Sequence, residues 1–246
     1  MARGDRERLT PRRIPSGAVE AHPRLSRAEL ALLDRMASEE YGLPIAVLME
    51  NAGRGAAEVI LQRLRDRGRA VVLAGSGNNG GDAYVVARHL ANGGVAVEIF
   101  SVGESRGDAA MMRRACERMG IPLHSLSDDG PPPLQAALGR ADVVVDGLLG
   151  TGFHGEVRPD IARWIEAVNQ SARERGTLVV ALDLPSGLDA DSGLPARPTI
   201  VADVTVTFAA PKIGFESARA KAHLGQVVVA SIGVPSALLR RVRGTT

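Results

Sequence analysis

Apolar residues recur along this chain with two alternating spacings, one typical of strands and one typical of helices. We expect strands at 70–74, 95–100, 141–145, 178–182, 201–208 and 226–230. Between the first five of these runs we expect helices near 83–92, 108–119, 132–138 and 159–174. This alternation predicts an α/β fold with a mostly parallel sheet covered by helices on both faces. The last two runs are joined by a short connection, so we expect them to extend the sheet as edge strands.

Two helices are expected before the first strand. Ser26, followed by Glu29, matches a capping box and predicts a helix that ends near Gly42 and Pro44. A second helix is expected over 44–67. The stretch before these helices, residues 1–24, is rich in Arg and Pro and has no apolar periodicity, which predicts a disordered arm. We therefore divide the chain into an arm (1–24), a single domain (25–240) and a tail (241–246).

Composition excludes several classes of protein. Among 246 residues, 45% are hydrophobic and 24% charged, as in ordinary globular proteins. The chain has neither a continuous apolar stretch of about 18 residues nor an N-terminal apolar signal core, so we expect no membrane span and no secretion. Cys116 is the single cysteine, which rules out an internal disulfide and favours the cytoplasm. A net charge of only +2 and 3% aromatic residues argue against nucleic-acid binding.

The most unusual stretches follow the expected strands, where parallel sheets bind their ligands. The first, AGSGNNGGD at 74–82, has the G-x-G-x-x-G spacing of dinucleotide-binding loops. Asp82 stands at the expected helix start, where it would cap the helix and oppose a pyrophosphate. Glu98, the acid at the spacing of a ribose ligand, lies inside a strand rather than at its end. The fingerprint is therefore weak, and a tight turn before a capped helix is the alternative.

A second unusual stretch is VVVDGLLGTGFHGE at 143–156. Asp146 ends an apolar strand, and four glycines follow within ten residues. An ordinary strand-to-helix connection needs ~2–6 residues, so this longer, glycine-rich one predicts a ligand-binding loop.

Two further strand ends carry polar residues. Asp183 ends the strand of VVALDLPSGLDADSG, and a proline and a glycine then bend the chain around Ser186. Asp189 and Asp191 lack the spacing of a calcium loop, and we interpret them as solvated turn acids. Lys212, in FAAPKIGF, is one of two lysines in an Arg-rich chain, and contact with a phosphate or a surface position are both open.

The polar residues at these strand ends form one class of ligand. They are oxygen donors with little net charge, and a parallel sheet brings them to one edge: Asn78, Asn79, Asp146, Asp183 and Ser186. Such donors suit a hard cation of low charge better than zinc, which prefers Cys and His. A carboxyl group at this edge could also act as a general acid or base.

Five segments together resemble a known family. They are LMENAGRGAAE (48–58), GSGNNGGDAYVVARHL (75–90), VVDGLLGTGF (144–153), LDLPSGLDADSG (182–193) and TFAAPKIGF (207–215). In this order they closely resemble the NAD(P)H-hydrate epimerases, the YjeF N-terminal domain family. The resemblance runs from about residue 25 to 235, and the joint pattern is specific although no single motif is.

The resemblance implies a Rossmann-like three-layer αβα sandwich, usually a homodimer, that binds K⁺. Members of the family interconvert the R and S forms of hydrated NADH and NADPH, called NADHX and NADPHX. These damaged cofactors carry a hydroxyl group at C6 of the nicotinamide ring. A dehydratase that uses ADP or ATP acts on the S form and restores the intact cofactor.

The resemblance also implies roles for residues at matching positions. The implied substrate-binding residues are Asn78, Asn79, Gly80, Gly81, Asp82, Gly150, Thr151, Gly152, Phe153, His154, Gly155, Glu156 and Asp183. The implied K⁺ ligands are Asn79, Asp146 and Ser186. His154 departs from the family pattern, because some relatives have Lys there. Many bacterial relatives carry a fused dehydratase, and here we expect that partner to be a separate protein.

The chemistry of epimerisation assigns a role to one carboxyl group. The ring nitrogen can expel the C6 hydroxyl, and water can then add to either face of the planar intermediate. We expect Asp183 to handle the protons, because it ends a buried strand at the site. Two other functions stay open, a non-catalytic nucleotide-binding scaffold of the same fold and a nicotinamide oxidoreductase. Conversion of R-NADHX to S-NADHX would distinguish the epimerase from both.

Overall fold

The computed structural model describes residues 22–64, 68–126 and 132–243. Within these residues, seven parallel strands form one sheet in the order β3-β2-β1-β4-β5-β6-β7. The strands are β1 (Arg69–Ala74), β2 (Ala96–Ser101), β3 (Leu123–Ser125), β4 (Val143–Gly147), β5 (Leu178–Leu182), β6 (Val204–Phe208) and β7 (Gln226–Ala230). The predicted α/β class and parallel sheet are confirmed.

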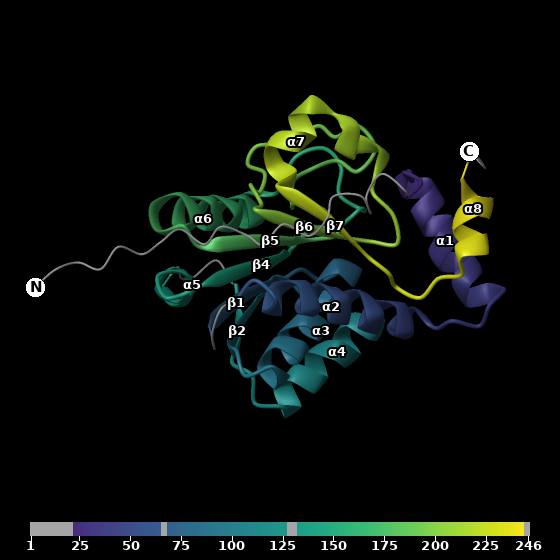
Figure 1. Ribbon diagram of the computed structural model, residues 1–246. Coiled ribbons are helices and arrows are strands. Elements are labelled where there is room, and N and C mark those ends of the chain that lie inside the picture. The colour runs from purple at the N-terminus through teal and green to yellow at the C-terminus, as the bar shows by residue number, and fades with distance from the viewer. Residues whose placement is uncertain (1–21, 65–67, 127–131, 244–246) are drawn as a thin grey trace, which may run out of the picture.

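Helices cover both faces of this sheet, as predicted for a three-layer sandwich (Figure 1). One face carries α2 (Ile45–Leu61), α3 (Asn78–Asn92) and α4 (Gly107–Arg118). The other carries α5 (Pro132–Leu138), α6 (Pro159–Arg175) and α7 (Ala218–Leu224), which follows the short helix η2 (Ile213–Glu216). The first and last helices, α1 (Arg27–Glu39) and α8 (Ser236–Val242), pack against each other beside the sheet.

The core divides according to the alternation of side chains along the strands. In β1, Val72 and Ala74 join the core under α2 and α3, whereas Val71 and Leu73 join the core under α5 and α6. Every residue of β1 after Arg69 is buried, as expected for an inner strand covered on both faces. This is why the strands appear in the sequence as continuous apolar runs.

The N-terminal helix follows its prediction closely. Glu29 N donates to Ser26 Oγ at 3.2 Å, and Ser26 N donates to Glu29 Oε2 at 2.7 Å, which completes the capping box. The next helix, α2, ends at Leu61, before the predicted end at residue 67. Residues 65–67 lie outside the described part of the chain.

Three predictions about the elements are wrong. Helix α3 begins at Asn78 rather than near 83, with Gly77 as its N-cap, so Asp82 lies inside the helix and does not cap it. The prediction gave too much weight to glycine as a helix breaker. The pattern also missed β3, which has only three residues, and the short helices α7 and α8. Finally, η2 and α7 separate β6 from β7, and β6 is an inner strand.

The flanking segments are described only in part. The predicted arm lies outside the described residues except for 22–24, where Arg24 forms an ion pair with Glu216 at 2.7 Å. Helix α8 continues through Val242, which is buried, so it extends into the predicted tail. None of the described helices has the length and apolar character needed to cross a membrane.

Candidate functional site

A cavity of about 700 Å³ lies at the carboxyl ends of the strands. It opens where β1 and β4 are neighbours, which is the point at which the strand order reverses direction. Ligands of doubly wound sheets bind at this place. Its walls come from α1, α2, the start of α3 and the segments after β4, β5 and β6. Leu30, Leu48, Met49 and Phe208 supply apolar surface, and Asp34, Asp82 and Asp183 supply carboxyl groups.

The segment from the end of β1 into α3 contains five of the predicted substrate-binding residues, and only some of them line this cavity. Asn78, Asn79 and Asp82 line the cavity, while Gly80 and Gly81 line no described cavity. A Cβ atom on Gly80 would lie 1.8 Å from the carbonyl oxygen of Gly75, and one on Gly81 would lie 2.6 Å from the side chain of Met49. These two glycines therefore let α3 pack tightly against its own turn and against α2.

Hydrogen bonds link the three implied K⁺ ligands, two of them through the backbone of Leu149 and the third through Ser186. Asn79 Nδ2 donates to Leu149 O at 2.8 Å, and Leu149 N donates to Ser186 Oγ at 2.9 Å. Ser186 Oγ and Ser186 N donate to the two carboxyl oxygens of Asp146 at 2.6 and 2.8 Å. Burial raises the pKa of Asp146 to about 6, although the hydrogen bonds from Ser186 and Leu148 limit the rise.

One atom in this group lacks a partner. Asn79 Oδ1 is buried and accepts no hydrogen bond from any described residue. A buried acceptor without a donor normally has an ion or a water molecule beside it. The set of an amide oxygen, a hydroxyl and one carboxylate consists entirely of hard oxygen donors, so these residues fit a monovalent hard cation.

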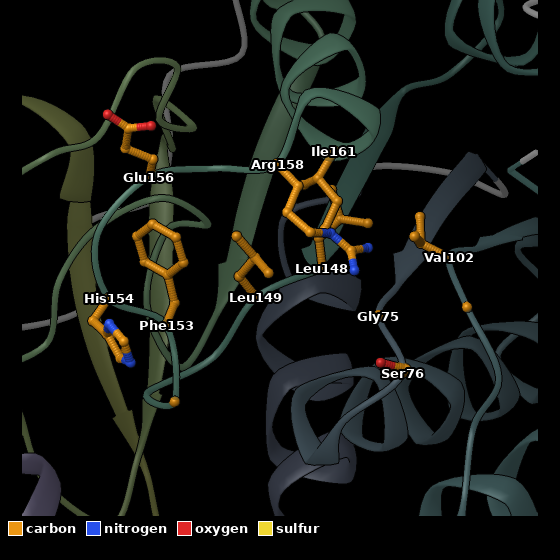
Figure 2. Close-up of a pocket in the computed structure, with 12 residues that line it drawn as sticks. Gly75, Ser76, Val102, Leu148, Leu149, Phe153, His154, Glu156, Arg158 and Ile161 are labelled. Atoms are coloured by element: carbon orange, nitrogen blue, oxygen red, sulfur yellow. The ribbon is translucent and has the colours of Figure 1, made fainter. Parts of the chain in front are cut away.

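The glycine loop after β4 spans two adjoining cavities. Gly150, Thr151, Gly152 and Phe153 line the larger one. Gly152, Phe153, His154 and Glu156 line a second cavity of about 350 Å³, and Gly155 lines neither. Figure 2 shows His154, Phe153 and Glu156 at one side of the smaller cavity, Ser76 and Val102 at the other, and Leu148 and Arg158 between them. Together the cavities suit a long ligand with two parts.

Arg27, at the start of α1, holds the glycine loop in place. Its Nη2 donates to Phe153 O at 2.9 Å and to Asp189 Oδ2 at 2.9 Å. Asp191, as expected, is exposed, but Asp189 is partly buried and forms an ion pair with Arg27. The prediction that both acids are merely solvated is therefore wrong for Asp189, which pairs with the Arg27 side chain. It is incomplete for Asp191, whose Oδ1 accepts a hydrogen bond from Arg27 N at 2.7 Å.

Asp183 pairs with the buried Lys212 at the end of the adjoining strands. Asp183 has a backbone φ of 65°, unusual for a residue other than glycine, and such strain is common at functional sites. Its Oδ1 accepts hydrogen bonds from Lys212 Nζ and from Phe208 N, the latter at 3.1 Å. Lys212 has no exposed surface, so the interpretation as a surface residue is wrong. Asp183 is thus the carboxylate that pairs with a fixed cation.

Two other carboxyl groups in the larger cavity have no such cation. Burial raises the pKa of Asp34 to about 6, with the charge of Asp183 adding to the rise and that of Lys212 opposing it. Burial raises the pKa of Asp82 well above its usual range, and Asp183 and Asp34 again add to the rise. The cavity therefore favours the protonated form of these two carboxyl groups.

Sequence reasoning missed Asp34 and Arg27 as parts of this site, and it left open whether Lys212 contacts a ligand. Asp34 stands four residues after Leu30, so it is a carboxylate on the otherwise apolar side of a helix, and that position was a usable signal. The scarcity of lysine in this chain was a signal for Lys212. Nothing in the local sequence connects Arg27 to the loops that it contacts, because those contacts depend on the fold.

Comparison with known proteins places this site in a family. Residues 45–214 match the family model described as the YjeF-related protein N-terminus, which covers more than half of the chain. The chain belongs to this family. The predicted resemblance to the YjeF N-terminal domains is therefore confirmed.

Relatives in this family include proteins of similar length. The chain is 42% identical to a Rhodopirellula baltica protein named NAD(P)H-hydrate epimerase, covering 89% of this chain and 88% of the relative. A Pirellula staleyi protein with the same name is 41% identical, covering 88% and 95%. A "Bifunctional NAD(P)H-hydrate repair enzyme" of Thermanaerovibrio acidaminovorans is 44% identical, and the match spans 82% of this chain but only 39% of that protein.

A solved structure supports the fold of this YjeF-related domain. The crystal structure of the yeast protein YNL200c superposes with a TM-score of 0.76 at 24% sequence identity. The match covers 90% of this chain and 93% of the yeast chain. The Rossmann-like architecture is thus shared over nearly the whole domain.

Proposed function

We infer that this protein is an NAD(P)H-hydrate epimerase, an isomerase that interconverts the R and S forms of hydrated NADH and NADPH. One observation carries this conclusion. A carboxyl-lined cavity lies at the reversal point of the sheet in a chain 42% identical, over 89% of its length, to a protein of that name. The adjoining smaller cavity gives room for the remainder of a dinucleotide.

The reaction requires little more than control of protons and water. The lone pair of the ring nitrogen expels the C6 oxygen, which takes up a proton and leaves as water while a planar iminium forms. Water then adds to the opposite face of C6 and releases its proton to a base. Atoms and charge balance, because one proton is donated and one is recovered in each turnover. Carboxylates in a water-poor cavity also stabilise the cationic intermediate.

Asp183 is positioned to act as the base in this reaction. Its Oδ1 is held by Lys212 and Phe208, and the side chain lines the larger cavity. Apolar residues such as Leu48 and Phe208 surround the space and limit the entry of additional water. Asn78 and Thr151 offer amide and hydroxyl groups that can hydrogen-bond the substrate from either side of the β1–β4 junction.

Asn79, Asp146 and Ser186 would hold a K⁺ ion. When bound, the ion supplies a positive charge that offsets the buried Asp146 carboxylate and gives Asn79 Oδ1 a partner. The support for this proposal is the hydrogen-bonded arrangement of these residues around Leu149 and the unpartnered amide oxygen. In this arrangement the three residues fix the start of the glycine loop, so their role is to position the loop.

The proposed setting follows from the same chemistry. The S form produced here would pass to a dehydratase that uses ADP or ATP, and the two activities would form a repair system in the cytoplasm. Relatives named bifunctional repair enzymes support a link between the two activities. We also propose that the protein forms a homodimer, which sedimentation analysis of the purified protein would test.

The decisive experiment is incubation of the protein with R-NADHX, followed by chromatographic separation of the R and S isomers. We expect conversion well above the spontaneous rate. Asp183→Asn should lower the turnover number by ~10²–10⁴-fold, the usual contribution of an acid or base. Wild-type conversion at the spontaneous rate would refute the epimerase and favour a binding scaffold. Near-normal turnover in the variant would refute the role of Asp183 alone.

A further inference from the structure

Two carboxyl groups of the larger cavity are left without protein partners. Asp34 comes from α1 and Asp82 from α3, and both line the cavity. Among the described residues, neither carboxyl accepts a hydrogen bond or forms an ion pair. Asp82 is only 8% exposed. A buried polar group without a partner indicates a missing ligand or a shared proton.

The surrounding charges do not neutralise this pair. The cationic residues that line the cavity are Lys212, which pairs with Asp183, and Arg27, which pairs with Asp189. Asp82 therefore faces the charges of Asp34 and Asp183, and Asp34 faces that of Asp183. Two like charges in such an environment cannot both ionise easily, so the pair tends to keep one proton between them.

Epimerisation needs a proton donor as well as an acceptor. The oxygen that leaves C6 must take up a proton, and the water that adds must lose one. Asp183 is already held by Lys212 as a hydrogen-bond acceptor, which suits the second task. The first task needs a protonated group in the same cavity.

We propose that Asp34 and Asp82 share one proton and form the catalytic acid that protonates the leaving C6 oxygen, while Asp183 accepts the proton from the incoming water. This inference rests on the proposed epimerase function. In the forward step the C6–O bond breaks, the carboxylic proton of the pair moves to the oxygen, and water leaves. Water then forms the new C6–O bond and gives its proton to Asp183. Exchange through water returns that proton to the pair, and the reverse reaction uses the same groups.

The electrostatics of the free enzyme agree with this assignment. Burial raises the pKa of Asp34 to about 6 and that of Asp82 well above its usual range, so both carboxyl groups keep a proton to higher pH than an exposed aspartate does. The groups that act on this pair come from three places: Asp183 after β5, Lys212 before η2, and the two aspartates themselves. An acid that is half-ionised near the working pH is an efficient proton donor.

The test compares Asp34→Asn and Asp82→Asn with Glu39→Gln. Glu39 is an exposed acid on the same helix as Asp34, so its substitution removes the same charge outside the cavity. We expect each Asn variant to lower the turnover number at least tenfold, and at most ~10⁴-fold, with KM within about threefold of wild type. The double variant should be little worse than the more severe single one, because the residues act as a unit. Asp34→Glu should recover part of the lost turnover.

A second measurement does not depend on the reaction. Carbon-13 NMR of aspartate carboxyl groups in the ligand-free protein should show one that titrates near the value of about 6, and this titration should change in either Asn variant. The inference is overturned if no carboxyl titrates there, or if either Asn variant turns over within twofold of Glu39→Gln. Failure of the wild-type protein to convert R-NADHX would instead refute the epimerase function, whatever the titration shows.

Discussion

At the scale of single residues, the most consequential feature is the fully buried ammonium group of Lys212. It donates to Asp183 Oδ1 and to Thr207 Oγ1, the latter at 2.9 Å, and lies near the carbonyl oxygens of Phe208 and Ala210. A compact ammonium group fits among these oxygens, whereas a planar guanidinium would not. This explains why a lysine occupies the position in a chain that otherwise uses arginine.

Lys212→Met should leave the Asp183 carboxylate without its cation. Breaking a buried pair by removing one partner costs about 3–5 kcal/mol. We expect the free energy of unfolding at neutral pH to fall by an amount of this order, measured by denaturant titration. The double variant Lys212→Met with Asp183→Asn removes both charges and should recover part of the loss. No recovery would mean that the pair's charges do not determine the stability of this region.

Asp34 should destabilise the folded protein as pH rises. Its pKa is raised from 3.8 in the unfolded chain to about 6 in the folded one, so the folded state binds the proton more tightly within that window. The stabilisation by the bound proton is fully present below the unfolded-state pKa of 3.8, and it is lost as pH rises through the folded-state pKa of about 6. Asp34→Asn should therefore gain stability over wild type as pH rises from about 4 to 7, by at most about 3 kcal/mol for a shift of this size. If the melting temperatures of Asp34→Asn and wild type changed with pH in the same way, this prediction would be contradicted.

At the scale of elements, the start of α3 differs most from its prediction. The sequence Asn-Asn-Gly-Gly-Asp suggested a loop, because two glycines weaken an isolated helix. In the fold they are required by close packing against Gly75 and Met49, so tertiary contact overrides local propensity. Asp146 and Asp183 were predictable from the sequence because each ends an apolar run. Asp34 was not assigned to the site because only the placement of α1 over the sheet edge brings it there.

Gly80→Ala should disrupt the turn between β1 and α3. The new Cβ atom would lie 1.8 Å from the carbonyl oxygen of Gly75, a contact that backbone atoms cannot relieve locally. We expect a loss of several kcal/mol in stability, in the range of the most damaging single substitutions of ~4 kcal/mol. Gly77→Ala is the control, because its Cβ atom would meet nothing within 4 Å. Equal melting temperatures for the two variants would show that the turn can shift.

Arg27→Ala should loosen the glycine loop with little effect on overall stability. Its ion pair with Asp189 is partly exposed, and such pairs contribute about 0–1 kcal/mol. Loss of the hydrogen bond to Phe153 O should instead raise KM several-fold and speed hydrogen exchange at 150–155. Arg54→Ala, which removes an exposed pair with Glu58 on α2, is the matched control and should change neither.

At the scale of the whole molecule, the alternation of strands and helices was sufficient to predict a parallel sheet with two covered faces. The order of the strands was not predictable from that pattern, because each crossover can go to either side. That order determines which loops meet: the ends of β1 and β4 adjoin, and β5 follows on. The geometry of the site therefore depends on the strand order. The polar residues at the strand ends could be predicted from the sequence, but their positions relative to one another could not.

K⁺ should stabilise the folded protein if the proposed ligands hold it. A ligand that binds only the folded state adds about 1.4 kcal/mol at ten times its dissociation constant. For a domain of this size, each kcal/mol of added stability raises the melting temperature by about 2–4 °C. We therefore expect a higher melting temperature in potassium chloride than in the chloride of a large organic cation at equal ionic strength. Asn79→Ala should lose this difference. If the melting temperature of Asn79→Ala rose equally in potassium chloride, K⁺ would be bound at a site other than the proposed one.

The peptide group of Leu149 has a consequence for how this chain tolerates changes in length. Asn79 Nδ2 donates to its carbonyl oxygen and its N–H group donates to Ser186 Oγ, so two other stretches of sequence are anchored to this one residue. Only two residues separate it from Asp146, which Ser186 also holds. An insertion there would have to release at least one anchor, whereas an extra residue beyond Gly152 could be accommodated further along the loop. Length variation in this connection is thus confined to its second half.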